Sequence, residues 1–179
     1  PITVGGGINK FEQVQKLLDY GADKVLINTG AFHNPGLINS VASKYGSQCL
    51  IVGIDITSSD DNICWQMKSH AGKLLQNLNL FNWIDEVIDR GVGEIMFTSI
   101  NRDGECNGMD LKLISRISKK ISVPLIASGG CGLANHFVEA YKAGASGVAA
   151  GTFFCKRDQN PMQCRSQIYN SDIPIRVNV

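Results

Sequence analysis

The sequence has almost no excess of charge of either sign and no long hydrophobic run. Its 17 Lys and Arg residues nearly balance 16 Asp and Glu residues, so the formal net charge at pH 7 is +1. Such a balance provides no electrostatic attraction for nucleic acid or for an anionic membrane surface. No segment approaches the roughly 20 apolar residues of a membrane-spanning helix, and the first residues lack the basic region of a signal peptide. We therefore expect a cytoplasmic protein that has no nucleic-acid or membrane partner.

The cysteines and histidines are not spaced like metal ligands or like a disulfide framework. The six cysteines contain no Cys-x-x-Cys pair, and 44% of the chain is hydrophobic, which is enough for a core without cross-links. His33, His70 and His136 lack metal-ligand spacing and are expected at the surface or in packing contacts. Cys131 lies in a glycine turn, but no nearby base that would activate it is recognisable. The sequence therefore predicts reduced thiols, no metal site and no cofactor.

Short apolar segments alternate with amphipathic segments along the chain. Strands are predicted at 2–4, 24–28, 50–55, 94–98, 124–127 and 147–150. Helices are predicted at 11–20, 36–44, 80–90, 111–119 and 135–143. Uninterrupted apolar runs such as Val25-Leu26-Ile27 are typical of parallel strands that are covered on both faces. The segment 58–76 breaks the alternation, and we expect a long loop there that carries a short hairpin.

An internal repeat favours a barrel over an open sheet. When the sequence is aligned with itself so that Pro1–Gly7 lies over Pro124–Gly130, Thr29 falls on Thr152 without a gap. Such self-similarity fits half of a (β/α)₈ barrel, a fold whose usual length is about 250 residues. An open Rossmann-type sheet is the alternative, although it explains the repeat less well.

The number of predicted strands is smaller than a complete barrel requires. Six strands are predicted, and the first of them follows directly on Pro1. We therefore expect one partial (β/α)₈ barrel domain over residues 1–179, with about two βα units absent at the N-terminus.

Two glycine turns at strand ends are candidate phosphate sites. Gly5–Gly7 and Gly129–Gly130 each lead toward a predicted helix, so backbone N–H groups can meet a phosphate with no Cβ in the way. Asn28–Thr29 and Gly151–Thr152 follow the neighbouring strands. A role confined to tight turns is the alternative interpretation. Two such sites on one rim fit a substrate that carries a phosphate at each end.

Four charged residues at strand ends are candidates for other roles. Asp55 ends an apolar strand, where partial burial would suit its carboxyl group to acid–base catalysis; an N-cap or a solvated turn is the alternative. Asp103 and Gly104 follow the next strand and form either a turn or part of a phosphate site. Lys24 and Glu94 each open a strand at the opposite end. These two are either exposed or joined in an inward ion pair that acts as a gate.

A resemblance to a known family rests on motifs that occur in a fixed order. They are TVGGGI at 3–8, GADKV at 21–25, INT at 27–29, TSINRDG at 98–104 and ASGG at 127–130. Together these motifs closely resemble the cyclase subunit of imidazole glycerol phosphate synthase, an enzyme of histidine biosynthesis. The resemblance extends from Pro1 to about Phe154. It implies a (β/α)₈ barrel in which this chain would supply the third to eighth βα units.

The resemblance also implies a partner, a substrate and a reaction. The partner is a glutaminase subunit, in a heterodimer, whose ammonia travels through the barrel. The substrate is a bisphosphorylated ribulosyl-formimino aminoimidazole carboxamide ribotide. The products are imidazole glycerol phosphate and aminoimidazole carboxamide ribotide, so the activity is that of a lyase.

Residue roles follow from the same resemblance. Asp55 matches one of the family's two catalytic aspartates, and the other belongs to the first strand, which this chain lacks. Lys24 and Glu94 match the ammonia gate, and Asp23 matches a residue that faces the glutaminase. One phosphate would be held by Gly7, Asn28 and Thr29. The other would be held by Asp103, Gly104, Gly130, Gly151 and Thr152.

Several positions depart from the family's usual pattern. Ile56–Ser58 stand where Ala-Lys-Arg is usual, Asn101 where Asp is usual and Met109 where Tyr is common. The segment Ala71–Asn77 also differs from the common Gly-Gly-x-Lys-x-Thr-Gly. These departures concern the side that covers the substrate, whereas the gate and the phosphate turns are retained.

Three functional hypotheses remain open at this point. The first is the cyclase subunit itself. The second is a paralogue that supplies ammonia for acetamidino-sugar formation in surface-polysaccharide synthesis, which the departures would suit. The third is a truncated fragment without catalytic activity.

Overall fold

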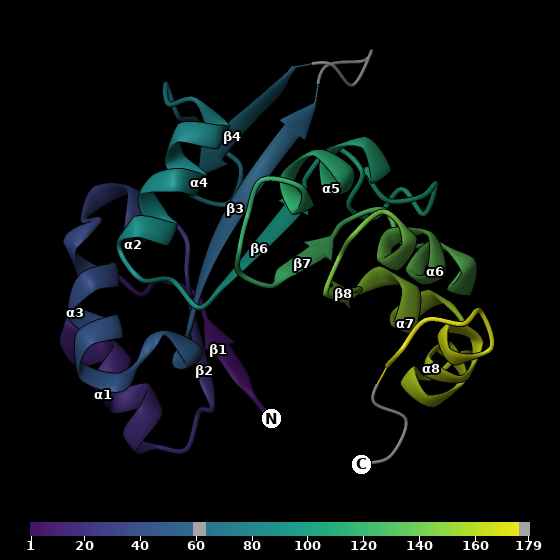
Figure 1. The fold of residues 1–179 in the computed structure, drawn as a ribbon, viewed down its shortest axis with the longest axis horizontal. Helices are drawn as coiled ribbons and strands as arrows, with labels where there is room; N and C mark the ends of the chain where they lie inside the picture. The colour runs from purple at the N-terminus through teal and green to yellow at the C-terminus, as the bar shows by residue number, and fades with distance from the viewer. Residues whose placement is uncertain (59–63, 176–179) are drawn as a thin grey trace.

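Strands alternate with helices in residues 1–58 and 64–175, the parts of the chain that this computed structural model describes. Six strands of the sheet pair in parallel with one another, and they curl into part of a barrel (Figure 1). They are β1 (Thr3–Gly5), β2 (Lys24–Ile27), β3 (Leu50–Ser58), β6 (Glu94–Ser99), β7 (Leu125–Ser128) and β8 (Gly147–Ala149).

The helices lie on the outer side of this curled sheet (Figure 1). They are α1 (Phe11–Asp19), α2 (Thr29–His33), α3 (Gly36–Tyr45), α4 (Leu80–Asp89), α5 (Leu111–Ser118), α6 (Ala134–Lys142), α7 (Thr152–Lys156) and α8 (Pro161–Tyr169), with a 3₁₀ turn at Ser47–Cys49. Among the described residues, no helix is both long enough and apolar enough to cross a membrane.

The order of the strands distinguishes a barrel from an open doubly wound sheet. The strands pair in the order β1-β2-β3-β6-β7-β8, which is also their order along the chain. A Rossmann-type sheet instead reverses its direction of growth part of the way through. The predicted partial (β/α)₈ barrel is therefore confirmed, and the Rossmann alternative is wrong.

Alternation along the strands separates a core face from a concave face. In β6, Ile95 and Phe97 are buried toward the helices, whereas Met96 and Thr98 are only half-buried on the other face. The pairing register places Asp55 beside Thr98 near the carboxyl ends of β3 and β6. The carboxyl ends of β3 and β6 therefore place half-buried polar side chains, Asp55 and Thr98, on the concave face.

The expected hairpin is present in the described part of segment 58–76, whose residues 59–63 lie outside the description. β4 (Trp65–Ser69) pairs antiparallel with the end of β3, and β5 (Leu74–Leu75) pairs with β4. The connecting residues Ala71 and Gly72 have φ values of 55° and 80°. Positive φ at both central residues is typical of the type I′ turn, which matches the twist of two-stranded hairpins.

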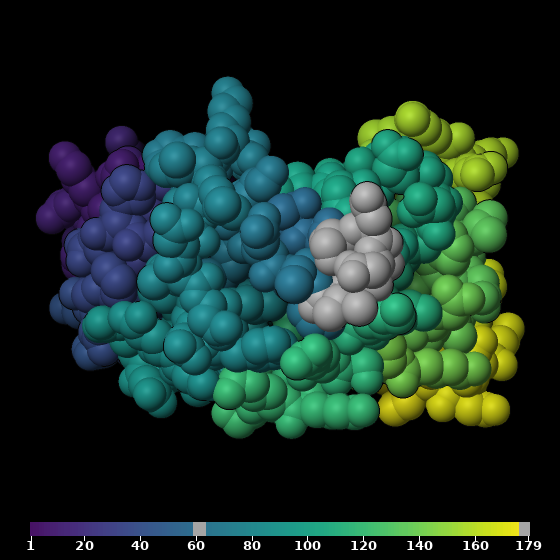
Figure 2. Space-filling model, turned by 90° about the horizontal axis from the view of Figure 1, so that it is seen from above, coloured from purple at the N-terminus to yellow at the C-terminus, as the bar shows by residue number. Residues whose placement is uncertain are grey.

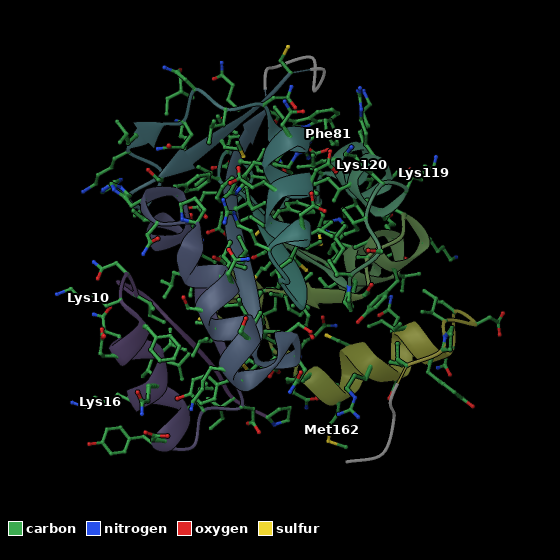
Figure 3. The ribbon with its side chains drawn as sticks, turned by 60° about the vertical axis from the view of Figure 1, so that its left-hand side comes forward. Lys10, Lys16, Phe81, Lys119, Lys120 and Met162 are labelled. Carbon is green, nitrogen blue, oxygen red and sulfur yellow. The ribbon has the colours of Figure 1, made fainter. Side chains whose placement is uncertain are left out.

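A cluster of aromatic and basic side chains fixes this hairpin against the helices. The Arg116 guanidinium lies 5.3 Å from the ring of Trp65 and 5.4 Å from that of Phe81. Lys120, which Figure 3 shows beside Phe81, has its ammonium group 6.0 Å from the same ring. The Trp65 indole N–H also donates to Asp110 at 3.2 Å. These contacts connect β4 to α4 and α5.

We expect Ile114→Ala to lower the free energy of unfolding by about 2–5 kcal/mol, because Ile114 is fully buried between α5 and the sheet. Urea denaturation measures this difference. Lys112→Ala, at an exposed position of the same helix, is the matched control and should change stability by less than about 0.5 kcal/mol. Equal effects of the two substitutions would contradict the assignment of this helix face to the core.

Candidate functional site

A cavity of about 810 Å³ opens where β1, β2 and β3 end, and we call it the first cavity. Four residues that the sequence singled out line it together: Gly7, Asn28, Thr29 and Asp55. A volume of this order is typical of pockets that bind small molecules. The structure thus brings one predicted phosphate turn and the predicted catalytic carboxyl group to one space.

Two adjacent turns build the wall of the first cavity. Gly6 and Gly7 have φ values of 109° and 67°, which side chains with a Cβ rarely adopt. A Cβ on Gly30, at the start of α2, would overlap the carbonyl oxygen of Ile8. The turn after β1 and the turn after β2 are therefore in backbone contact, and only glycine permits that approach.

Asp55 is half-buried where β3 enters the first cavity. Burial raises the pKa of its carboxyl group above the ordinary value of 3.8, and a hydrogen bond from the Asn28 side chain offsets part of that rise. Asn28 Oδ1 is itself buried and accepts no hydrogen bond within the described residues. The site therefore combines a carboxyl group shifted toward acid–base chemistry with an unused acceptor beside it.

A second, much smaller cavity of about 10 Å³ lies where β6, β7 and β8 end, and we call it the second cavity. Gly130 has a φ of 94°, and a Cβ there would overlap the carbonyl oxygen of Gly108. Gly108 N–H in turn donates to the Gly130 carbonyl at 2.9 Å. The lining includes every residue predicted for the second phosphate: Asp103, Gly104, Gly130, Gly151 and Thr152.

The strand order sets the relation between the two cavities. The first belongs to β1–β3 and the second to β6–β8, so the strand that carries Asp55 lies in the middle of the sheet. In the space-filling view, the N-terminal and C-terminal parts of the chain occupy opposite ends of the molecule (Figure 2). A ligand with an anionic group at each end could span this arrangement and pass Asp55.

Lys24 and Glu94 form an ion pair at the other end of the strands. They open β2 and β6, which flank β3, and their side chains are 31% and 19% exposed. The Asp23 carboxylate accepts a hydrogen bond of 2.6 Å from the Ile2 N–H, although Asp23 itself is exposed. The charged residues predicted for the gate are thus paired with each other, on the side opposite Asp55.

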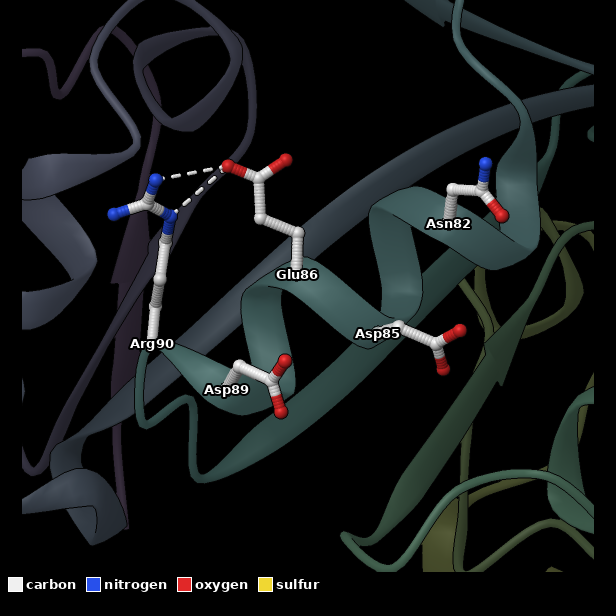
Figure 4. A pocket seen from close by; sticks show the side chains of 5 residues that line it. All are labelled: Asn82, Asp85, Glu86, Asp89 and Arg90. Carbon is white, nitrogen blue, oxygen red and sulfur yellow. Dashed lines mark hydrogen bonds and ion pairs between the residues drawn. The ribbon is translucent and has the colours of Figure 1, made fainter.

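Another hollow lies on the outer surface of α4 and contains none of the predicted residues. It is lined by Asn82, Asp85, Glu86, Asp89 and Arg90 (Figure 4). Arg90 forms an ion pair with Glu86 at 2.9 Å, one turn earlier on the helix. This hollow is a charged helix surface and is not part of the candidate site.

Sequence reasoning missed three residues that line the first cavity: Lys10, His33 and His70. Both histidines are exposed, as expected, but they face a candidate site rather than open surface. The backbone N–H of His70 donates to Thr29 Oγ1 at 3.0 Å, across a long separation in sequence. The hairpin that the sequence predicts could have indicated that this segment lies near the site. Its position over the end of β2 depends, however, on how β4 pairs with β3.

Cys131 is buried, and burial raises the pKa of its thiol to about 12. The thiol therefore stays protonated at neutral pH and is a poor nucleophile. This agrees with the absence of a recognisable activating base in the sequence.

We expect Asp55→Asn to stabilise the protein increasingly as pH rises from 3.8 toward the raised pKa of Asp55 in the folded state. Because the pKa of Asp55 is raised in the folded state, folding favours the protonated form, and stability falls as pH rises through the folded pKa. An amide cannot ionise, so the stability of the variant does not fall in this way. Urea denaturation at several pH values measures the difference in free energy of unfolding between the two proteins, and Asp19→Asn on the exposed face of α1 is the control. A difference independent of pH would contradict the shifted pKa.

Comparisons with known proteins point to one family. A family model described as "Histidine biosynthesis protein" matches residues 1–160. A Prochlorococcus marinus protein named "Putative imidazole glycerol phosphate synthase subunit hisF2" is 53% identical over 177 residues, which are 99% of this chain and 67% of that protein.

Two proteins named imidazole glycerol phosphate synthase subunit HisF are also similar to this chain. The one from Wolinella succinogenes is 40% identical over 177 residues, and the one from Flavobacterium johnsoniae is 41% identical over 178 residues. In both cases the match covers 99% of this chain and 70% of the relative.

Proposed function

The chain belongs to the histidine biosynthesis protein family, and we propose that it is the cyclase subunit of a glutamine-dependent imidazole glycerol phosphate synthase. The observation that carries the proposal is Asp55, a half-buried carboxyl group with a raised pKa on the middle strand of the sheet. Asp55 lines the first cavity, and the glycine turns after β6, β7 and β8 lie further along the same sheet, which suits a substrate with two phosphates. The relatives named HisF support the same conclusion.

In this proposal, each end of the bisphosphorylated ribotide has its own binding site. Gly7, Asn28 and Thr29 hold one phosphate in the first cavity. The loops that follow β6, β7 and β8 and line the second cavity hold the other at its mouth. Because both phosphates are fixed, the reacting part of the substrate is held over the concave face near Asp55, and this positioning lowers the entropic barrier to reaction.

Asp55 then transfers protons during cyclisation and cleavage. Its burial keeps a larger fraction of the carboxyl group protonated near neutral pH than an exposed aspartate would have. The same group can therefore donate a proton and, as a carboxylate, accept one. The Asn28 side chain, which hydrogen-bonds to Asp55, keeps the carboxyl group oriented toward the cavity.

Ammonia reaches this face from the glutaminase partner in the proposed mechanism. The Lys24–Glu94 ion pair lies at the amino ends of the strands, so ammonia would have to pass it before reaching Asp55. Asp23 is exposed at the same end and would face the partner.

The central test uses protein expressed from its complete natural coding sequence, supplied with ammonium chloride and the bisphosphorylated ribotide. We expect imidazole glycerol phosphate to form, and Asp55→Asn to reduce kcat by about 10²–10⁴-fold with little change in substrate affinity. Liquid chromatography with mass detection follows the product. Glu12→Gln, at an exposed position of α1, is the charge-matched control. Unchanged turnover in Asp55→Asn would remove this residue from the mechanism.

A separate prediction concerns the ion pair. We expect Lys24→Met to change the rate supported by glutamine and the glutaminase partner several-fold relative to the rate supported by added ammonium, because only the first route passes the pair. Lys44→Met, at an exposed position of α3, is the control and should leave the ratio of the two rates unchanged. If the ratio of the glutamine-supported rate to the ammonium-supported rate were the same in Lys24→Met as in the unsubstituted protein, the role of the ion pair as a gate would be contradicted.

One observation favours a second candidate function, that of a paralogue supplying ammonia for acetamidino-sugar formation. Ser58 and Asn101, which both depart from the family's usual pattern, also contact each other. Asn101 Nδ2 donates to Ser58 Oγ at 3.0 Å, so a neutral pair stands where charged residues are usual. Absence of imidazole glycerol phosphate in the ammonium assay would favour this candidate.

A further inference from the structure

A chain of hydrogen bonds runs from Gln76, directly after β5, through Ser69 of β4 to His70 at the wall of the first cavity. Gln76 Nε2 donates to Ser69 Oγ at 2.7 Å, and Ser69 Oγ lies 2.9 Å from His70 Nδ1. Ser69 is fully buried, whereas His70 lines the cavity. A buried hydroxyl group therefore sets the orientation of an imidazole at the edge of the site.

The chemistry of these groups favours one position for the proton of the neutral imidazole. Ser69 Oγ accepts from the Gln76 amide nitrogen, which only donates, and among the described residues the buried Ser69 hydroxyl has no acceptor for its own proton except His70 Nδ1. If the ring is instead protonated, Nδ1–H donates to Ser69. In both states His70 Nε2 carries a hydrogen. His70 therefore offers an N–H donor to the cavity whatever its charge.

The same segment also fixes the hydrogen bonding of the Thr29 hydroxyl group. The backbone N–H of His70 donates to Thr29 Oγ1 at 3.0 Å, which uses one lone pair of the hydroxyl group and leaves its proton for a ligand. Both residues line the first cavity beside Gly7. The hairpin therefore brings two donors to the phosphate turn, namely Thr29 O–H and His70 Nε2–H.

The surrounding structure holds His70 in an unusual conformation. His70 has a φ of 53° and starts the turn formed by Ala71 and Gly72. The ring of His33, on α2, packs edge-on against the ring of His70 at a centroid distance of 5.3 Å. Left-handed backbone at a non-glycine residue persists only where the surroundings fix it, and such residues cluster at ligand sites.

We propose that His70 is a phosphate-binding residue of the first cavity, in which its Nε2–H and the Thr29 hydroxyl donate to oxygens of the same phosphate monoester. Ser69 and Gln76 are positioning residues, because they act on the phosphate only through His70. That the cavity takes a phosphorylated substrate rests on the function proposed above. The contribution of His70 from the hairpin follows from the hydrogen bonds themselves.

Binding of D-ribose 5-phosphate to the purified protein, measured by titration calorimetry, tests the proposal, with D-ribose as the uncharged probe. We expect His70→Phe to weaken binding of the phosphate ester about tenfold, which is typical for loss of one hydrogen bond to a charged ligand. His70→Gln, which restores a donor, should recover part of the affinity. Gln66→Ala, at an exposed position of β4, is the control for disturbance of the hairpin and should bind like the unsubstituted protein.

The positioning role needs a measurement that packing alone would not change. We expect ¹⁵N spectra of the imidazole to report protonated Nε2 and unprotonated Nδ1 for His70 in the neutral ring, and Ser69→Ala to produce a mixture of the two tautomers. The same variant should weaken ribose 5-phosphate binding less than His70→Phe does. An unchanged tautomer in Ser69→Ala would overturn the positioning role.

The outcomes separate this inference from the proposed function. If Thr29→Val weakens binding and His70→Phe does not, the cavity binds phosphate without His70, and the inference is overturned while the proposed function stands. If His70→Phe weakens binding but no cyclisation occurs with ammonium, His70 is a phosphate ligand and the proposed function fails. If the unsubstituted protein does not bind ribose 5-phosphate, the inference is overturned directly.

Discussion

The parallel pairing of β3 between β2 and β6 is the interaction on which the rest of the structure depends. β3 is buried along its length except near its carboxyl end, so its apolar residues fix the curvature of the sheet against the helices. Asp55 stands at the point where this burial ends. The ion pair of Lys24 and Glu94 joins the two neighbouring strands at the other end. The positions of Asp55 and of the Lys24–Glu94 ion pair therefore both depend on β3.

The two faces of the sheet have different roles: one stabilises the fold, and the other carries the groups proposed for the reaction. Side chains that point toward the helices are apolar and close-packed, which supplies the hydrophobic stabilisation of the fold. Toward the carboxyl ends of the strands, the concave face carries half-buried polar side chains such as Thr98 and Asp55, and burial disfavours the charged form of Asp55. A site of this kind costs stability, because the desolvation that makes a carboxyl group useful for proton transfer also opposes its ionisation.

Local patterns explain which features could be predicted from the sequence. Strand positions followed from apolar runs, and the glycine turns followed from the need for positive φ at residues such as Gly7 and Gly130. The contacts of His70 with Thr29, and of Ser58 with Asn101, depend on how segments distant in sequence meet. No short pattern encodes those distances, because they depend on the twist of β3 and on the register of the hairpin that continues it. The histidines are at the surface or in packing contacts as expected, but the sequence did not indicate that two of them line the first cavity.

The two-residue turn at Ala71–Gly72 has a consequence for how this protein can diverge. Side chains alternate between the faces of a strand, so loss or gain of one residue in the turn would shift the residues after it by one position relative to β4, and Gln76 would no longer lie on the same face as Ser69. Substitutions within the turn change only its strain, whereas an insertion or deletion would break the hydrogen bond between Gln76 and Ser69. Among homologous chains, the length of this turn should therefore vary less than its composition.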